Sequence, residues 1–180
     1  MYDGTLHDVT SRSTSDNVRP DLEQLKAIVR EGQPIICFHN HPGEDGRAAM
    51  FPSGDDFELA GLVSFMTYAH DPELAVQFRI AQLGGEQETF VAYGFKGSAL
   101  SEIKALAFEY SAATTRRDNV ASIEAKQHRV VAQLAREAST DYLAHVCPPE
   151  PTATDAAACR THPEYFLWPS DRFFIHHRAP

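Results

Sequence analysis

Residues 35–59 read IICFHNHPGEDGRAAMFPSGDDFEL, and the order of predicted elements in this stretch indicates the class of fold. It begins with a run of β-branched and aromatic residues that ends at Pro42, which predicts a buried strand opening into a loop. The loop over 43–50 holds two glycines and three charged residues, a composition typical of exposed loops. Ser53 or Asp55 can then cap a helix over Asp56–Ala69. The order strand, loop, helix indicates an α/β domain.

Two histidines close the expected strand, and their spacing suits a metal. Residues two apart in a strand point to the same side, so His39 and His41 project together while Asn40 points away. Asp56, at the start of the following helix, can present a carboxylate to the same point. Two imidazoles and one carboxylate leave the fourth position of a tetrahedral zinc ion open for water, as a catalytic site requires. Ser53, one helical turn before Asp56, could donate a hydrogen bond to an oxyanion.

The pattern extends beyond the two histidines. A His-x-His pair alone also occurs on strands that bind no metal. Here HNHP at 39–42 is followed by PSGDDFEL at 52–59, which resembles the JAMM signature (also called MPN+ or JAB1/MPN/Mov34) of metalloproteases. The chain is most similar to the RadC-like and bacterial JAB-domain branch, because GTL at 4–6, a helix and an apolar strand precede HNHP in the same order. The likeness covers about residues 4–95.

This resemblance implies a fold and a site. The fold would be a mixed, curved β-sheet flanked by helices. The zinc ligands would be His39, His41 and Asp56, and Ser53 would face the oxyanion. Asp56 is preferred to Asp55 because it keeps the Ser-x-x-Asp register. A water bound to zinc would then attack the carbonyl of a peptide or isopeptide bond.

Two features depart from the family pattern. The stretch between His41 and Asp56 is longer, so residues 44–49 would form an insertion beside the site that selects substrate or covers it. The family also has an upstream catalytic Glu, which takes the proton from the attacking water. Aligned through GTL, that Glu would fall at or before Met1.

The chain offers three substitutes for this Glu, none of them well matched. Asp3 is the nearest acidic residue, but its side chain is shorter. Glu23 and Glu31 fall on an expected helix and should face solvent. The chain is therefore interpreted as the C-terminal part of a longer protein, or as a variant that binds zinc without full activity.

Periodicity predicts the remaining elements. We expect a strand near Gly4–Ser11, strands over 75–84 and 88–95, and helices over Asp21–Glu31, Ser98–Ala113 and Asn119–Thr140. The sequence predicts three parts. A JAMM-like core, incomplete at its N-terminus, covers residues 1–97, and a helical extension covers 98–146. A Pro-rich linker with an aromatic C-terminal segment covers 147–180. The aromatic part, HPEYFLWPSDRFFIHH, should dock on the domain or on a protein partner.

Composition limits the partners. The formal net charge is -9 and no cluster of Lys and Arg stands out, which disfavours nucleic acid. No apolar run approaches the roughly 20 residues that span a bilayer. The N-terminal stretch has neither a basic region nor an apolar one, so we expect no signal peptide. Three widely spaced cysteines favour a reducing compartment, hence a cytoplasmic protein or one delivered by a specialised secretion system.

Other residues carry weaker signals. Cys37 shares a strand face with His39 and could approach the metal, although a small buried thiol is the commoner role. A second zinc site at Cys147, Cys159 and His162 would lack a fourth ligand. His176 and His177 are predicted to be surface residues. Phe173, Phe174 and Ile175, which precede them, are predicted to pack in the protein interior.

Three functions follow, in order of preference. The first is a zinc-dependent peptidase or isopeptidase that acts on a peptide or protein substrate. The resemblance also allows such a domain to be the toxin or effector module of a larger secreted bacterial protein. The second is a catalytically inactive zinc-binding JAMM-like module that acts through protein contacts. The third, a RadC-like DNA-processing protein, is disfavoured by the acidic balance.

Overall fold

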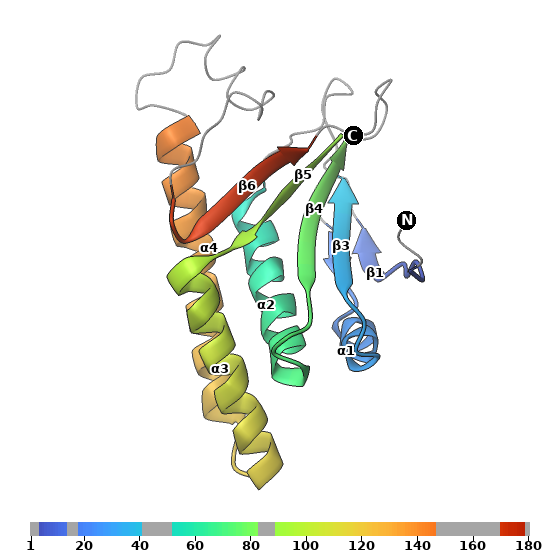
Figure 1. Cartoon of the computed structure of the whole chain (residues 1–180), viewed down its shortest axis with the longest axis vertical. Helices are drawn as coiled ribbons and strands as arrows, with labels where there is room; N and C mark the ends of the chain where they lie inside the picture. Colours follow the sequence, from blue (N-terminus) through green and yellow to red (C-terminus); the bar gives the residue numbers. More distant parts are fainter. Residues whose placement is uncertain (1–3, 14–17, 41–51, 83–88, 147–169, 179–180) are drawn as a thin grey trace.

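A four-stranded mixed sheet forms one layer of the fold (Figure 1). The computed structural model describes residues 4–13, 18–40, 52–82, 89–146 and 170–178. The strand order is β3-β4-β5-β6, with bounds β3 Ile35–Asn40, β4 Val76–Gln82, β5 Thr89–Phe95 and β6 Phe173–Arg178. β3 runs parallel to β4, and the other neighbours are antiparallel. The expected α/β class is confirmed.

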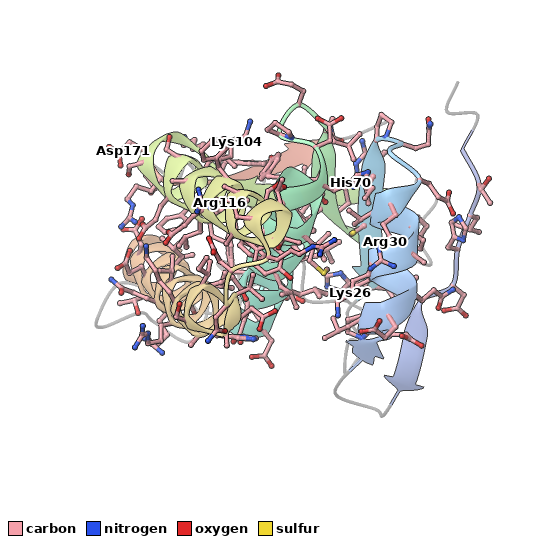
Figure 2. All side chains as sticks on the ribbon, turned by 90° about the horizontal axis from the view of Figure 1, so that it is seen from below. Lys26, Arg30, His70, Lys104, Arg116 and Asp171 are labelled. Atoms are coloured by element: carbon pink, nitrogen blue, oxygen red, sulfur yellow. The ribbon has the colours of Figure 1, made fainter. Side chains whose placement is uncertain are left out.

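The helices form the second layer. They are α1 Leu22–Arg30, α2 Gly54–His70, α3 Gly97–Arg116 and α4 Ala121–Val146. α2 is central, because it contacts β4, β5 and each of the other three helices. Seen from below, the sheet lies along one side of α2, with α1 and α4 on either side of that helix (Figure 2). The same view shows the lower helix ends, marked by Arg30, His70 and Arg116.

Local signals account for the helix bounds. Asp21 caps α1, its carboxylate accepting hydrogen bonds from the backbone N–H groups of Glu23 and Gln24 at 3.0 and 3.1 Å. Gly32 then ends the helix with a positive φ of 68°. α4 continues beyond the expected end at Thr140, because no proline or glycine interrupts it before Pro148.

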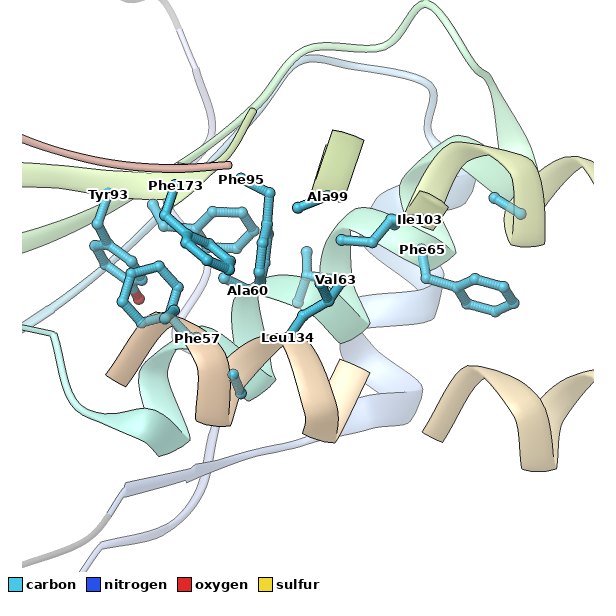
Figure 3. Packing of buried hydrophobic residues seen from close by; sticks show 14 of the residues in the cluster. Phe57, Ala60, Val63, Phe65, Tyr93, Phe95, Ala99, Ile103, Leu134 and Phe173 are labelled. Carbon is cyan, nitrogen blue, oxygen red and sulfur yellow. The ribbon is translucent and has the colours of Figure 1, made fainter. Parts of the chain in front are cut away.

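Buried aromatic residues from distant parts of the chain meet in one core (Figure 3). Phe57 of α2, Tyr93 and Phe95 of β5 and Phe173 of β6 make edge-to-face contacts at 5.4–6.1 Å. Leu134 of α4 packs in the same cluster. Residues from all three expected parts of the chain thus share one hydrophobic core.

The C-terminal aromatic segment forms part of the sheet. β6 pairs with β5 over its whole length, from Phe95↔Phe173 to Phe90↔Arg178. Phe173 is buried, as expected from its interpretation as a packing residue. The expected docking on the domain is thus confirmed for residues 170–178, whereas Tyr165, Phe166 and Trp168 lie outside the described residues.

The N-terminal strand is shorter than expected. The prediction of a strand near Gly4–Ser11 is wrong for residues 4–9, since β1 spans Thr10–Ser13. Its partner β2, Val18–Pro20, has only three residues, so residues before Thr10 have no strand to pair with among the described ones. Val9 instead accepts a backbone hydrogen bond from Asp21 at 2.7 Å.

No helix in the described part of the chain is long and apolar enough to cross a membrane.

Candidate metal centre

The candidate site lies where β3 ends and α2 begins, at the end of the molecule opposite to the one seen in Figure 2. His39 is paired in register with Ile80, a fully buried residue of β4. Directly paired residues point to the same side of a sheet, so His39 faces the helical layer. Asn40 is exposed, as expected from strand alternation.

His39 and Asp56 are in direct contact. The Nε2 atom of His39 lies 2.9 Å from the Oδ1 atom of Asp56. The side chains are 25% and 14% exposed, so the contact is largely shielded yet open to solvent on one side. The structure thus brings together two of the three expected zinc ligands.

Ser53 holds the other oxygen of the carboxylate. The Oδ2 atom of Asp56 accepts hydrogen bonds from the backbone N–H of Ser53 at 2.6 Å and from its hydroxyl at 2.8 Å. In return, the Ser53 hydroxyl accepts from the backbone N–H of Asp56 at 3.2 Å. This reciprocal arrangement is a capping box at the start of α2. It confirms the expected cap and fixes the carboxylate with Oδ1 directed at His39.

The imidazole of His39 and the carboxylate of Asp56 are suitable zinc ligands, and the distance between their facing atoms is close to the one that a shared zinc ion requires. Imidazole nitrogen and carboxylate oxygen are ordinary zinc ligands at about 2.0–2.2 Å, which places two ligand atoms of a tetrahedral ion about 3.3 Å apart. The observed separation between His39 and Asp56 is 2.9 Å. Opening the pair by about 0.4 Å would therefore let both atoms bind one ion.

The expected third ligand, His41, lies outside the described residues, and so does the expected insertion over 44–49. Within the described residues, no group of three or more His, Cys, Asp and Glu is placed to hold a metal. Cys37 therefore does not join His39 and Asp56 in such a group, although it shares a strand face with His39. It packs against the core, in agreement with the expected buried thiol.

The described acidic candidates for a general base do not reach the pair. Glu31 follows α1 and precedes β3, so it lies at the far end of a strand that takes roughly 13 Å to reach His39. Glu23 is exposed and pairs with Lys26 at 2.7 Å. Asp3 lies outside the described residues, as do Cys147, Cys159 and His162 of the second candidate site.

The inner wall of the site is apolar. Burial raises the pKa of the Cys37 thiol to about 11. Burial also raises the pKa of the Tyr93 phenol well above its ordinary value, and the negative charge of Asp56, together with that of Cys37 once its thiol is ionised, raises it further. Charges in such surroundings interact more strongly than in water.

Sequence reasoning missed Tyr93 as a neighbour of the site. Its ring lies 6.4 Å from the imidazole of His39, with the ring planes perpendicular. Alternation along β5 could have placed Tyr93 on the buried face with Val91. Only the strand order, however, brings it close to β3.

Comparison of the chain with protein-family models, with curated proteins and with solved structures found no match in any of the three.

Proposed function

We propose that this chain is a zinc-dependent hydrolase of the JAMM type that cleaves peptide or isopeptide bonds. The observation that carries the proposal is the 2.9 Å contact between His39 and Asp56, with Ser53 holding the second carboxylate oxygen. In the segment that resembles the JAMM signature, the aspartate thus contacts both the serine and the first histidine. His41 would complete the ligand set.

Each of these residues has a separate task in the proposed reaction. When bound, zinc would polarise the substrate carbonyl and lower the pKa of a water molecule. His39, His41 and Asp56 would hold the ion. Ser53 keeps the carboxylate of Asp56 oriented, and its hydroxyl would have to turn from Asp56 to donate a hydrogen bond to an oxyanion.

A second candidate function is a zinc-binding module that acts through protein contacts without catalysis. Two observations favour it. Among the described residues no Glu forms a metal-holding group of three with His39 and Asp56, and the expected substitutes Glu23 and Glu31 belong to α1 and its C-cap. The hydroxyl of Ser53 is already used in the cap of α2.

Metal content tests the proposal first. Elemental analysis of the purified chain should give about one zinc per chain, and a His39→Ala/His41→Ala double variant should give none. Absence of zinc from the wild type after incubation with zinc would overturn both functions, provided that circular dichroism shows both proteins folded.

Activity then separates the two functions. The zinc-loaded chain should release the fluorophore from a quenched peptide, or from an isopeptide in which a C-terminal glycine is joined to a lysine Nζ. The double variant is the control. Zinc binding without cleavage of either probe would favour the non-catalytic module.

A further inference from the structure

Tyr93 contacts both elements that carry the proposed zinc ligands. Its ring is perpendicular to the imidazole of His39 on β3, at a centroid distance of 6.4 Å. It also makes an edge-to-face contact with Phe57 of α2, at 5.4 Å and 76°. Phe57 directly follows Asp56 in the sequence. Tyr93 thus contacts both the strand that presents His39 and the first turn of the helix that presents Asp56.

The position of the Tyr93 ring is fixed by its surroundings. Only 1% of Tyr93 is exposed, and Phe78 packs against it at 5.9 Å. Figure 3 shows Tyr93 extending from the sheet towards Phe57. A side chain enclosed by close-packed neighbours keeps one rotamer, and so gives a rigid surface to the groups that rest on it.

The contact with His39 restricts the imidazole. Perpendicular packing is a favoured arrangement of aromatic rings at this separation. The Nε2 atom of His39 is directed at Asp56, and the Tyr93 ring packs against the same imidazole. Neighbouring groups that orient the ring of a histidine ligand strengthen metal binding, and their removal typically weakens it about 10–100-fold.

We propose that Tyr93 is a positioning residue for the metal centre, whose aromatic ring holds the imidazole of His39 in the orientation that binds zinc. This inference rests on the proposed zinc site. It assigns the role to the ring of Tyr93 rather than to its hydroxyl.

Zinc affinity, measured by competition with a chelator, tests the inference. Tyr93→Leu removes the ring and should weaken zinc binding about tenfold. This is the lower end of the loss found when groups that orient a metal ligand are removed. Tyr93→Phe keeps the ring and should bind as the wild type does. The matched control is Phe65→Leu, which removes a buried aromatic ring of α2 whose ring contact is with Tyr110.

The possible outcomes are distinct. Equal affinity of Tyr93→Leu and Phe65→Leu would overturn the inference, because a loss of general stability would then explain any effect. An equal loss in Tyr93→Phe and Tyr93→Leu would also overturn it, since the hydroxyl would be responsible. A wild type that binds no zinc would instead overturn the proposed function.

A second measurement does not depend on the variants folding. In the wild-type protein, nuclear Overhauser effects between the imidazole protons of His39 and the ring protons of Tyr93 should be present with and without added zinc. Their absence in the zinc-loaded protein would show that the ring does not hold the imidazole in the bound state, and would overturn the inference.

Discussion

The Nε2 atom of His39, the second-last residue of β3, lies 2.9 Å from the Oδ1 atom of Asp56 in the first turn of α2. This contact joins the end of a strand to the start of a helix across a connection of more than a dozen residues. The capping box fixes the position of the Asp56 carboxylate, because its Oδ2 atom accepts hydrogen bonds from Ser53. The parallel pairing of β3 with β4 fixes the backbone position of His39.

Asp56 and its neighbour Asp55 should behave differently on replacement. Asp56→Ala removes the carboxylate that contacts His39, and should abolish zinc binding. Asp55→Ala changes an exposed carboxylate in the same helical turn and should retain the wild-type zinc content. Elemental analysis of both proteins, with circular dichroism as a check of folding, makes the comparison. Full zinc content in Asp56→Ala would show that the aspartate is assigned wrongly.

Local patterns explain why much of this region could be predicted from sequence. The bounds of β3 and α2 follow from a short apolar run and a Ser-x-x-Asp cap, both contained within a few residues. Contacts between neighbouring turns, such as that of Ser53 with Asp56, need no knowledge of the rest of the fold.

Long-range pairing explains what the sequence did not predict. β6 joins the sheet beside β5 although two helices separate them in the chain, and no local signal specifies that neighbour. The contact of Tyr93 with His39 depends on the same strand order, because β4 lies between their strands. β2 was missed because a three-residue strand that ends in proline carries almost no pattern.

Ser53 should contribute to stability independently of metal. Ser53→Ala removes the hydroxyl that caps α2, and should lower the free energy of unfolding by about 1 kcal/mol. Ser53→Thr keeps a hydroxyl that can accept the same N–H bond and should lose less. Urea denaturation of the two variants in the presence of a chelator measures the difference. An unchanged midpoint in Ser53→Ala would argue against the capping box.

Cys37 should be a slow nucleophile, and its reactivity should rise steeply with pH. Burial raises the pKa of its thiol from 9.0 to about 11, so the thiolate fraction at pH 8 should be about 100-fold lower than for an unshifted thiol. The rate of alkylation by iodoacetamide would be measured in a Cys147→Ser/Cys159→Ser variant. The same variant unfolded in urea is the control, and equal rates in both states would contradict the prediction.

The same shift predicts how stability depends on pH. Above pH 9 the unfolded chain loses the Cys37 proton while the folded chain keeps it until about pH 11. This thiol therefore lowers the free energy of unfolding as pH rises through that window. The loss should be smaller in Cys37→Ala than in the wild type, when each is compared with its own stability at pH 8.

Gly61 allows the close approach of α2 and α4. A Cβ atom at this position would lie 2.8 Å from Cγ1 of Val131, closer than van der Waals contact allows. Gly61→Ala should therefore destabilise the fold by about 1–3 kcal/mol, as overpacking does, despite the better helix propensity of alanine. Thermal unfolding measures the effect.

Two further variants test the cause. Val131→Ala removes the clashing methyl groups, so the Gly61→Ala/Val131→Ala double variant should recover part of the loss. Gly54→Ala adds a methyl group to the same helix, where the nearest atom, Cβ of Ser139, lies at an ordinary 3.8 Å. It should not destabilise by overpacking. Additive losses in the double variant would contradict the proposed clash.

Arg172 should hold β6 against the helical layer. Its guanidinium pairs with Glu137 of α4 and lies 3.7 Å from Glu102 of α3. It also lies over the ring of Phe173, with Cζ 5.6 Å from the ring centroid. Arg172→Met should lower the free energy of unfolding by about 1–2 kcal/mol, because two partly shielded carboxylates lose their cation.

The matched control for Arg172 is Arg116, at the exposed end of α3 (Figure 2). Arg116 pairs with Asp118 at 2.9 Å, but both side chains are more than half exposed. Arg116→Met should therefore cost less than about 0.5 kcal/mol. In Arg172→Met the backbone amides of β6 should also exchange with solvent faster than in the wild type, as hydrogen exchange would show. Equal effects of the two variants on stability, with unchanged exchange in β6, would mean that strand pairing with β5 alone holds the C-terminal strand.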